Sequence, residues 1–176
     1  SKVKINALCC ETDGELKPKT VIGAEVIAMN GKTIAEQCDD YLRNYGKIYF
    51  PEVVYTKNEE DIHLMHIVSD SVDRRTENAG KLQTVKLLYI MALSLANELE
   101  LQSIALELLH CDISRRESLE AFIKAYSAIS SSEDGTSVQP TINHVFLLSN
   151  DAAETADIIA ALGDADSKKT EGAEKK

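Results

Sequence analysis

The stretch from Leu82 to Tyr126 constrains the fold of this chain most. In its first part, apolar residues recur at steps of three and four, which is the period of one helix face. A short apolar run from Ser103 to Leu106 follows, and helical spacing resumes near Arg115. Helix, buried strand and helix in this order are the unit of a parallel sheet covered on both faces. We therefore predict an α/β protein.

The carboxyl end of this buried strand is where we expect a site. Ligands of open parallel sheets bind in the crevice beyond the carboxyl ends of the strands. In this chain that position is the segment 107–114, which contains His110, Cys111 and Asp112. The sequence therefore predicts that a ligand would meet this loop.

The other elements follow from hydrophobic period and turn residues. Strands are predicted at 2–10, 24–29, 48–56, 62–68 and 142–148, and further helices at 32–45 and 151–162. The strand at 24–29 is expected to be buried on both faces and to end at Asn30-Gly31. Gly46 is expected to end the helix at 32–45. That helix is predicted to turn five side chains inward: Ile34, Cys38, Tyr41, Leu42 and Tyr45. The polar run 57–61 predicts a hairpin.

Length and composition predict one domain with a tail. At 176 residues the chain is long enough for a single core, which we assign to 1–162. Residues 163–176 contain no apolar side chain larger than alanine, so we expect a disordered charged tail.

Charge and cysteine usage limit the function classes. The net charge of -10 disfavours general binding to nucleic-acid backbones. Lys86, Glu98 and Glu100 interrupt the long helix, so it is not expected to span a membrane. The four cysteines lack metal or disulfide spacing, which predicts reduced thiols in an intracellular protein, cytoplasmic or nuclear.

Together, these segments resemble the macro domain family from about Ala24 to Leu162. Residues 62–69 (IHLMHIVS) resemble its "yVIHxVgP" strand, and the run ALSLANELELQSIAL within 82–106 is similar to "L..A.elgl.SIAfP". Residues 145–151 (VFLLSND) resemble its last strand and acidic end. Residues 25–30 (EVIAMN) resemble its "DAIVNAAN" strand.

The resemblance implies a three-layer α/β/α fold around a central mixed, mostly parallel sheet, with a cleft for ADP-ribose. In the family, a glycine-rich loop after the "NAAN" strand and a second "GtGifG" loop bring backbone N–H groups to the diphosphate. An Asp holds the adenine, for which Asp13 is the candidate here, and an Asn orients the distal ribose. Some members hydrolyse ADP-ribose from proteins or small molecules.

This sequence departs from the family at the phosphate loops. Only Gly31 follows Asn30, and the glycines of the second loop align with His110, Asp112 and Arg115. Side chains there would fill the space of a diphosphate, and Asp112 would repel it by roughly 1–4 kcal/mol at 4 Å. If the cleft retains a ligand, six residues are predicted to contact it: Asn30, Gly31, His110, Cys111, Asp112 and Ile113.

Other candidate chemistries have weaker support. His110, Cys111 and Asp112 are the residue types of a thiol nucleophile site, but three consecutive residues cannot converge on one substrate atom. His63 and His66 point to opposite faces of a strand, which disfavours a shared metal. We therefore predict no catalytic residue, no metal and no cofactor.

Three functions remain open. The first is a noncatalytic macro-domain-like module that acts through protein-protein contacts, with a degenerate ADP-ribose cleft; the N-terminal domain of leucine aminopeptidases, which serves assembly, is a similar case. Its contact surface is predicted on the long helix, at Leu87, Ile90, Met91 and Leu93. The second is a reader of ADP-ribose or a related nucleotide with an altered cleft. The third is an ADP-ribosyl hydrolase, which needs an acid or base that the sequence does not identify.

Overall fold

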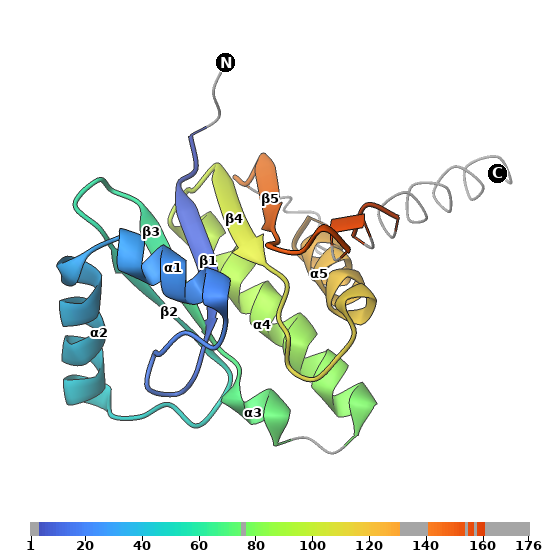
Figure 1. The fold of residues 1–176 in the computed structure, drawn as a ribbon, viewed down its shortest axis with the longest axis horizontal. Coiled ribbons are helices and arrows are strands. Elements are labelled where there is room, and N and C mark those ends of the chain that lie inside the picture. The colour runs from blue at the N-terminus through green and yellow to red at the C-terminus, as the bar shows by residue number, and fades with distance from the viewer. Residues whose placement is uncertain (1–3, 75–76, 131–140, 154, 157, 161–176) are drawn as a thin grey trace, which may run out of the picture.

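A central sheet organises the computed structural model, which describes residues 4–74, 77–130, 141–153, 155–156 and 158–160. Its strands are β1 (Ala7–Thr12), β2 (Glu52–Lys57), β3 (His63–Val68), β4 (Ser103–Glu107) and β5 (His144–Leu148). They lie in the order β2-β3-β1-β4-β5 (Figure 1). β1, β3, β4 and β5 are parallel, and β2 pairs antiparallel with β3. The predicted mixed, mostly parallel sheet is confirmed.

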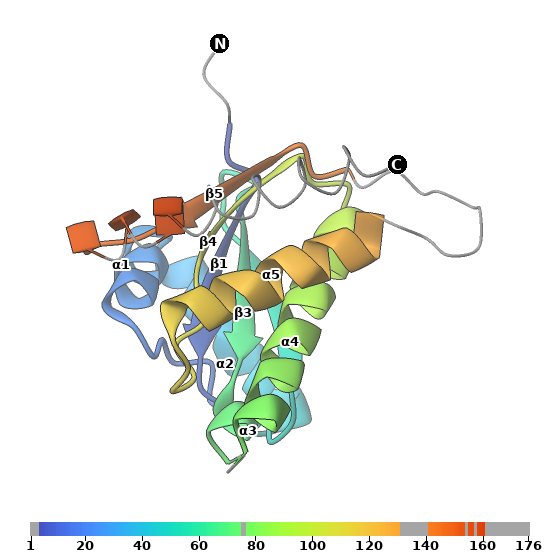
Figure 2. The same ribbon diagram turned by 90° about the vertical axis from the view of Figure 1, so that its right-hand side faces the viewer.

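Helices cover both faces of this sheet. α1 (Val21–Met29) and α2 (Lys32–Tyr45) lie on one face, and α4 (Asn78–Glu98) and α5 (Arg115–Ser130) lie on the other (Figure 2). The short α3 (Asp70–Asp73) follows β3. The layers are therefore α/β/α, as the resemblance implied.

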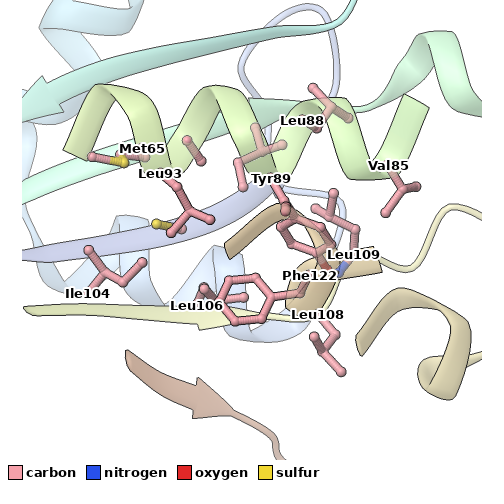
Figure 3. Close-up of a cluster of buried hydrophobic side chains, with 14 of the residues drawn as sticks. Met65, Val85, Leu88, Tyr89, Leu93, Ile104, Leu106, Leu108, Leu109 and Phe122 are labelled. Carbon is pink, nitrogen blue, oxygen red and sulfur yellow. Dashed lines mark hydrogen bonds between the residues drawn. The ribbon is translucent and has the colours of Figure 1, made fainter. Parts of the chain in front are cut away.

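The main core lies between the sheet and the pair α4 and α5. Leu88, Tyr89 and Leu93 of α4 are buried in this core, and Tyr89 and Leu93 point toward α5 and β4 (Figure 3). Tyr89 meets the ring of Phe122 edge to face at 5.3 Å, and its hydroxyl accepts the backbone N–H of Leu109 at 2.8 Å. This hydrogen bond attaches the loop after β4 to the core.

The predicted strand at 24–29 is wrong, because these residues form most of α1. Thr20 caps the helix by accepting the Gly23 N–H at 3.0 Å. A short apolar run does not by itself distinguish a strand from a buried helix. Val21 and Met29 are exposed, so the segment is not buried on both faces either.

Several local predictions are confirmed and two need adjustment. The helix 32–45 ends at Gly46, whose φ of 76° favours glycine, and residues 58–62 connect the hairpin of β2 and β3. Tyr45 was expected inward but is 75% exposed. β1 begins later than predicted and runs through Glu11 and Thr12, which are buried.

The ends of the chain are covered only in part. Residues 152–153, 155–156 and 158–160 are helical, in line with the predicted closing helix. The predicted tail 163–176 lies outside the described residues.

The outer surface of α4 is less apolar than the sequence predicted. Leu87 is 46% exposed, Ile90 and Met91 are half-buried, and Leu93 is only 1% exposed. Leu93 belongs to the core and cannot contact a partner, because it faces β4 and α5 rather than solvent. Among the described residues, no helix combines the length and apolarity needed to cross a membrane.

Candidate functional site

The site is built where β1 and β4 end side by side. These neighbouring parallel strands carry Glu11 and Glu107 toward the same edge of the sheet, and both side chains are buried. The Glu11 backbone N–H lies 3.4 Å from Oε1 of Glu107. Two buried carboxylates in one place are uncommon, since each must be compensated by hydrogen bonds or charge.

Glu11 is compensated by four donors. Its Oε2 accepts the backbone N–H of His110 at 2.7 Å, and its Oε1 accepts the hydroxyl of Ser69 at 2.5 Å. Oε1 also lies 3.3 Å from Nζ of Lys19 and 3.4 Å from Sγ of Cys111. Burial by itself would raise the pKa of Glu11, but these donors together hold the pKa below its ordinary value. Glu11 is therefore an internal anion.

Lys19 connects this anion to α3. Its Nζ donates to Ser69 at 2.9 Å and to Asp73 at 2.6 Å, and it lies 3.8 Å from Asp70. Burial lowers the pKa of Lys19, but Asp73 and Glu11 outweigh burial and raise it. The lysine therefore stays charged and has several carboxylate partners within the protein.

Glu107 is compensated less completely. Its Oε1 accepts the hydroxyl of Thr20 at 2.5 Å, and Oε2 is buried without a hydrogen-bond partner among the described residues. Burial is the main cause that raises the pKa of Glu107. Thr20 also caps α1, so its hydroxyl group connects the start of this helix to Glu107. Gly23 packs closely there, since a Cβ at Gly23 would lie 3.0 Å from the hydroxyl oxygen of Thr20.

A cavity of about 260 Å³ opens beside Glu107. Apolar side chains of α1 and β5 form much of its wall, namely Val21, Ile22 and Leu148. Its polar lining comes from Lys19, Thr20, Glu107, His110 and Asn150. The cavity therefore combines an apolar wall with a buried carboxylate.

The loop after β4 has a strained conformation. Cys111 and Asp112 have φ values of 30° and 51°, in the left-handed region that favours glycine. The thiol of Cys111 is buried, which raises its pKa, so it is not an activated nucleophile. Asp112 is exposed and pairs with Lys81 of α4 at 2.8 Å, and Ile113 packs against the main core.

His110 is the predicted ligand residue that lines the cavity. Its side chain is exposed and contacts the guanidinium of Arg115, which also donates to the Leu108 carbonyl at 2.9 Å. Asp112 was expected to fill the space of a diphosphate, but its pairing with Lys81 keeps it out of the cavity lining.

Asn30 and Gly31 lie at the opposite edge of the sheet. The side chain of Asn30 accepts from Asn58 at 2.6 Å, in the hairpin turn that precedes β3. Because 24–29 is a helix that returns toward the amino ends of the strands, Asn30 and Gly31 do not meet the 110–113 loop. The structure thus divides the six predicted ligand residues into two distant groups, and their role in binding stays a prediction.

Sequence reasoning missed both buried glutamates as functional residues. Glu11 lies just beyond the strand predicted at 2–10, and Glu107 was noted only as the start of the segment after the buried strand. They are 96 positions apart, and no spacing rule joins residues at that distance. For metal binding, the described ranges contain no group of three suitable side chains, and His66 bonds Thr56 at 2.9 Å with a pKa that burial lowers to about 4.

Comparison with known proteins identifies the fold. No protein-family model matches the chain, and no curated protein sequence is significantly similar. A mutant of the Oceanobacillus iheyensis macrodomain is similar at a TM-score of 0.75 and 15% identity, covering 95% of this chain and 88% of that one. The same macrodomain with ADP gives 0.72 and 14%, covering 93% and 86%.

A third solved structure, the Trypanosoma brucei macrodomain in complex with ADP-ribose, gives a TM-score of 0.70 at 12% identity. The match covers 90% of this chain and 63% of the Trypanosoma brucei macrodomain chain. At these identities the similarity establishes architecture rather than activity. With its α/β/α layers and strand order β2-β3-β1-β4-β5, the chain has the macrodomain fold.

Proposed function

We propose that this protein is a noncatalytic macro-domain-like module that acts through protein contacts and whose cleft no longer holds ADP-ribose. One observation supports the proposal that ADP-ribose is not bound. The carboxylate of Glu11 accepts hydrogen bonds from the backbone N–H of His110 and the hydroxyl of Ser69, and it pairs with the ammonium group of Lys19. These are the kinds of donors that bind a phosphate at the ends of strands.

The electrostatics support the same conclusion. A diphosphate beside Glu11 and Glu107 would meet two buried carboxylates, and each unit charge at 4 Å would repel it by roughly 1–4 kcal/mol. Lys19 offers little compensation, since it already pairs with Glu11 and Asp73. The bonds of Glu11 to His110, Ser69 and Lys19 would therefore have to break before a diphosphate could contact these donors.

The size of the cavity is a second, independent support. Its volume of about 260 Å³ is below the roughly 300–1,000 Å³ that is typical of pockets for drug-sized ligands. ADP-ribose is at the large end of that class, so the cavity would hold only a fragment of it.

Exposed aromatic residues support the part of the proposal that concerns protein contacts. Tyr45, Tyr49 and Phe50 are 75%, 60% and 58% exposed at the end of α2 and in the segment after it. Aromatic side chains are enriched in protein interfaces, and large exposed apolar groups close in sequence are a marker of them. We propose this aromatic segment (45–50) as a contact surface, together with Leu87 of α4.

Calorimetric titration with ADP-ribose tests the lost cleft. We expect no heat of binding at millimolar nucleotide, while a macrodomain known to bind ADP-ribose gives a full isotherm under the same conditions. Micromolar affinity, about -8 kcal/mol, would refute the proposal.

Site-specific photo-crosslinking in cells tests the contact surface. A photoreactive residue at Tyr49 should give discrete protein adducts, whereas the same residue at Glu36, on the solvent-exposed side of α2, should give none. Equal yields at the two positions would argue against a contact through the aromatic segment.

A reader of ADP-ribose or a related nucleotide is the second candidate. It is supported by the position of the cavity at the carboxyl ends of β4 and β5, and by neighbours in the fold that were solved with ADP or ADP-ribose. If the titration shows binding, this candidate leads. Glu107, a buried carboxyl with a raised pKa, would then be the residue to test for hydrolysis.

A further inference from the structure

The two edges of the sheet are protected to different degrees. β2 forms one edge and β5 the other. At β2, the side-chain amide of Gln37 accepts the backbone N–H of Lys57 at 3.0 Å and donates to the Lys57 carbonyl at 2.7 Å. The Glu52 carboxylate accepts the backbone N–H of Val53 at 3.0 Å. Side chains of this kind keep other chains from pairing with an exposed edge, so β2 is largely closed to a further strand.

β5 has no such protection among the described residues. Its sequence, HVFLL, contains no charged residue and no proline. The His144 N–H donates to the carbonyl of Gln102, at the start of β4. Because successive residues of a strand turn their N–H and C=O groups to opposite sides, those of Val145 and Leu147 point away from β4. No described residue forms a hydrogen bond with these outward groups, to which a further strand could bind.

An apolar groove of about 520 Å³ lies beside this edge, on the face of the sheet that α5 covers. Val145 and Leu147 line this β5 groove from the strand, and Phe122 and Ile123 line it from α5, which lies below β5 in Figure 2. Ile159, which is 64% exposed, also lines it. A cavity of roughly 150 Å³ accommodates a benzene ring. The β5 groove therefore has room for more than one apolar side chain.

An occupant of the edge must bring apolar side chains that are not already packed. In an antiparallel pair of β5 strands from two copies, Val145 and Leu147 of the second copy would face the groove. These side chains already pack against the core of their own copy. The net charge of -10 also makes two copies repel each other. A separate extended segment has unpacked side chains and need not be acidic, so it suits the edge better than a second copy.

We propose that the β5 edge and the β5 groove bind an extended segment of a partner protein, which adds a strand to the sheet. Its backbone pairs with the outward groups of Val145 and Leu147, and its alternate apolar side chains enter the groove. In this mode of recognition the backbone hydrogen bonds give affinity, and the groove selects the side chains at every second position. The acidic charge of the chain favours basic residues on either side of the paired segment.

The inference deepens the protein-contact part of the proposed function and rests on that part alone. It uses a different surface, since the aromatic segment (45–50) follows α2, whereas β5 is the edge strand opposite to β2. It does not depend on the fate of the nucleotide site, because the β5 groove and the cavity beside Glu107 share no described lining residue.

The test uses a synthetic peptide in which valine alternates with threonine between flanking lysines. We would titrate it into the full chain and follow backbone amides by ¹H–¹⁵N correlation spectra. The amides of 119–123 and 144–148 should shift, whereas those of 52–57 on β2 should not. Absence of shifts at millimolar peptide would overturn the proposal, as would equal shifts at the two edges.

Two N-methylated forms of the peptide separate strand pairing from mere apolar contact. One form carries the methyl groups on the valine nitrogens and the other on the threonine nitrogens, and both keep every side chain. Because successive N–H groups of a strand point to opposite sides, only one form can still donate to the carbonyls of Val145 and Leu147. That form should bind like the parent peptide, and the other should bind about tenfold more weakly, since it lacks two hydrogen bonds. Equal affinities of the two forms would refute an added strand.

Two variants of the chain locate the binding. Val145→Pro removes an outward N–H that takes no part in the ladder to β4, so the sheet should persist. Ile159→Lys places a charge at the groove on an exposed residue. Each should weaken the peptide by at least about tenfold, whereas the control Met29→Lys, at an exposed position on α1, should not change its affinity. Unchanged affinity in both Val145→Pro and Ile159→Lys would refute the assignment of the site.

Two further results separate the occupants and the failures. Sedimentation should show a monomer, and a dimer that is lost in Val145→Pro would overturn the proposal in favour of pairing between copies. Protein adducts at Tyr49 without peptide binding would refute only the inference about β5. Peptide binding without adducts at Tyr49 would refute only the aromatic segment, and the absence of both would refute the proposed function in protein contacts.

Discussion

Replacing Glu11 by Gln removes the internal anion while keeping its shape. Glutamine has one acceptor oxygen, so either the His110 N–H or the Ser69 hydroxyl must face an NH₂ group. A hydrogen bond to a charged group contributes roughly 1.5–3 kcal/mol. Part of this lost free energy is offset, because the variant no longer has to desolvate a buried charge. We expect the variant to lose about 2 kcal/mol of unfolding free energy at pH 7.

The pH dependence makes this prediction sharper. The pKa of Glu11 in the folded protein lies below its ordinary value of 4.5, so its contribution is fully present above pH 4.5. It is lost as the pH falls through the folded-state pKa, because the unfolded chain takes up the proton first. Glutamine does not titrate, so the difference between wild type and Glu11→Gln should shrink as the pH is lowered from 7 to 3.

Urea denaturation followed by circular dichroism at both pH values measures this difference. Glu15→Gln is the matched control, since the Glu15 side chain is partly exposed, unlike that of Glu11, and pairs with the exposed Lys17. Its unfolding midpoint should stay close to that of the wild type. If Glu11→Gln lowers the unfolding free energy by the same amount at pH 7 and pH 3, the charge of Glu11 is not what stabilises the site.

Three further substitutions and one control, at Leu87, test the fold, each by urea denaturation. Leu88→Ala should lower the unfolding free energy by roughly 3–5 kcal/mol, because Leu88 is fully buried. The same change at its neighbour Leu87 should cost less than about 1 kcal/mol, and equal losses would contradict the assigned faces of α4. Gly14→Ala should cost roughly 1–3 kcal/mol, since its Cβ would lie 2.1 Å from the Ile48 carbonyl oxygen; a neutral result would mean that this loop packs differently. Thr20→Val should cost about 1–2 kcal/mol, because it removes both the cap of α1 and the hydrogen bond to Glu107; an unchanged midpoint would contradict both contacts.

Local signals were sufficient for much of the chain. The period of α4, the apolar run of β4 and the hairpin of β2 and β3 each depend on residues close in sequence. Gly46 ends α2 because its φ of 76° is costly for other residues. These preferences act within one or two turns of chain, so they are visible without tertiary structure.

The residues 21–29 mark the limit of such reasoning. Their apolar run fits either a strand or a helix, and the resemblance of 25–30 to a family strand favoured the strand. The cap from Thr20 and the contact of Gly23 with Cys10 of β1 decide for α1. Because these residues form a helix, Asn30 lies away from the cleft in which the resemblance had placed it.

By itself, the sequence determined the α/β class, most of the elements and the absence of glycine from the loop after β4. Only the tertiary structure decided the chemistry of the site. Glu11 and Glu107 are distant in sequence, and each has no meaning as a site residue until parallel pairing of β1 and β4 brings them to one edge. Burial raises the pKa of Glu107, whereas at Glu11 the surrounding donors outweigh burial and lower the pKa. Periodicity predicts elements because it reflects neighbours along the chain, whereas a site depends on neighbours in space.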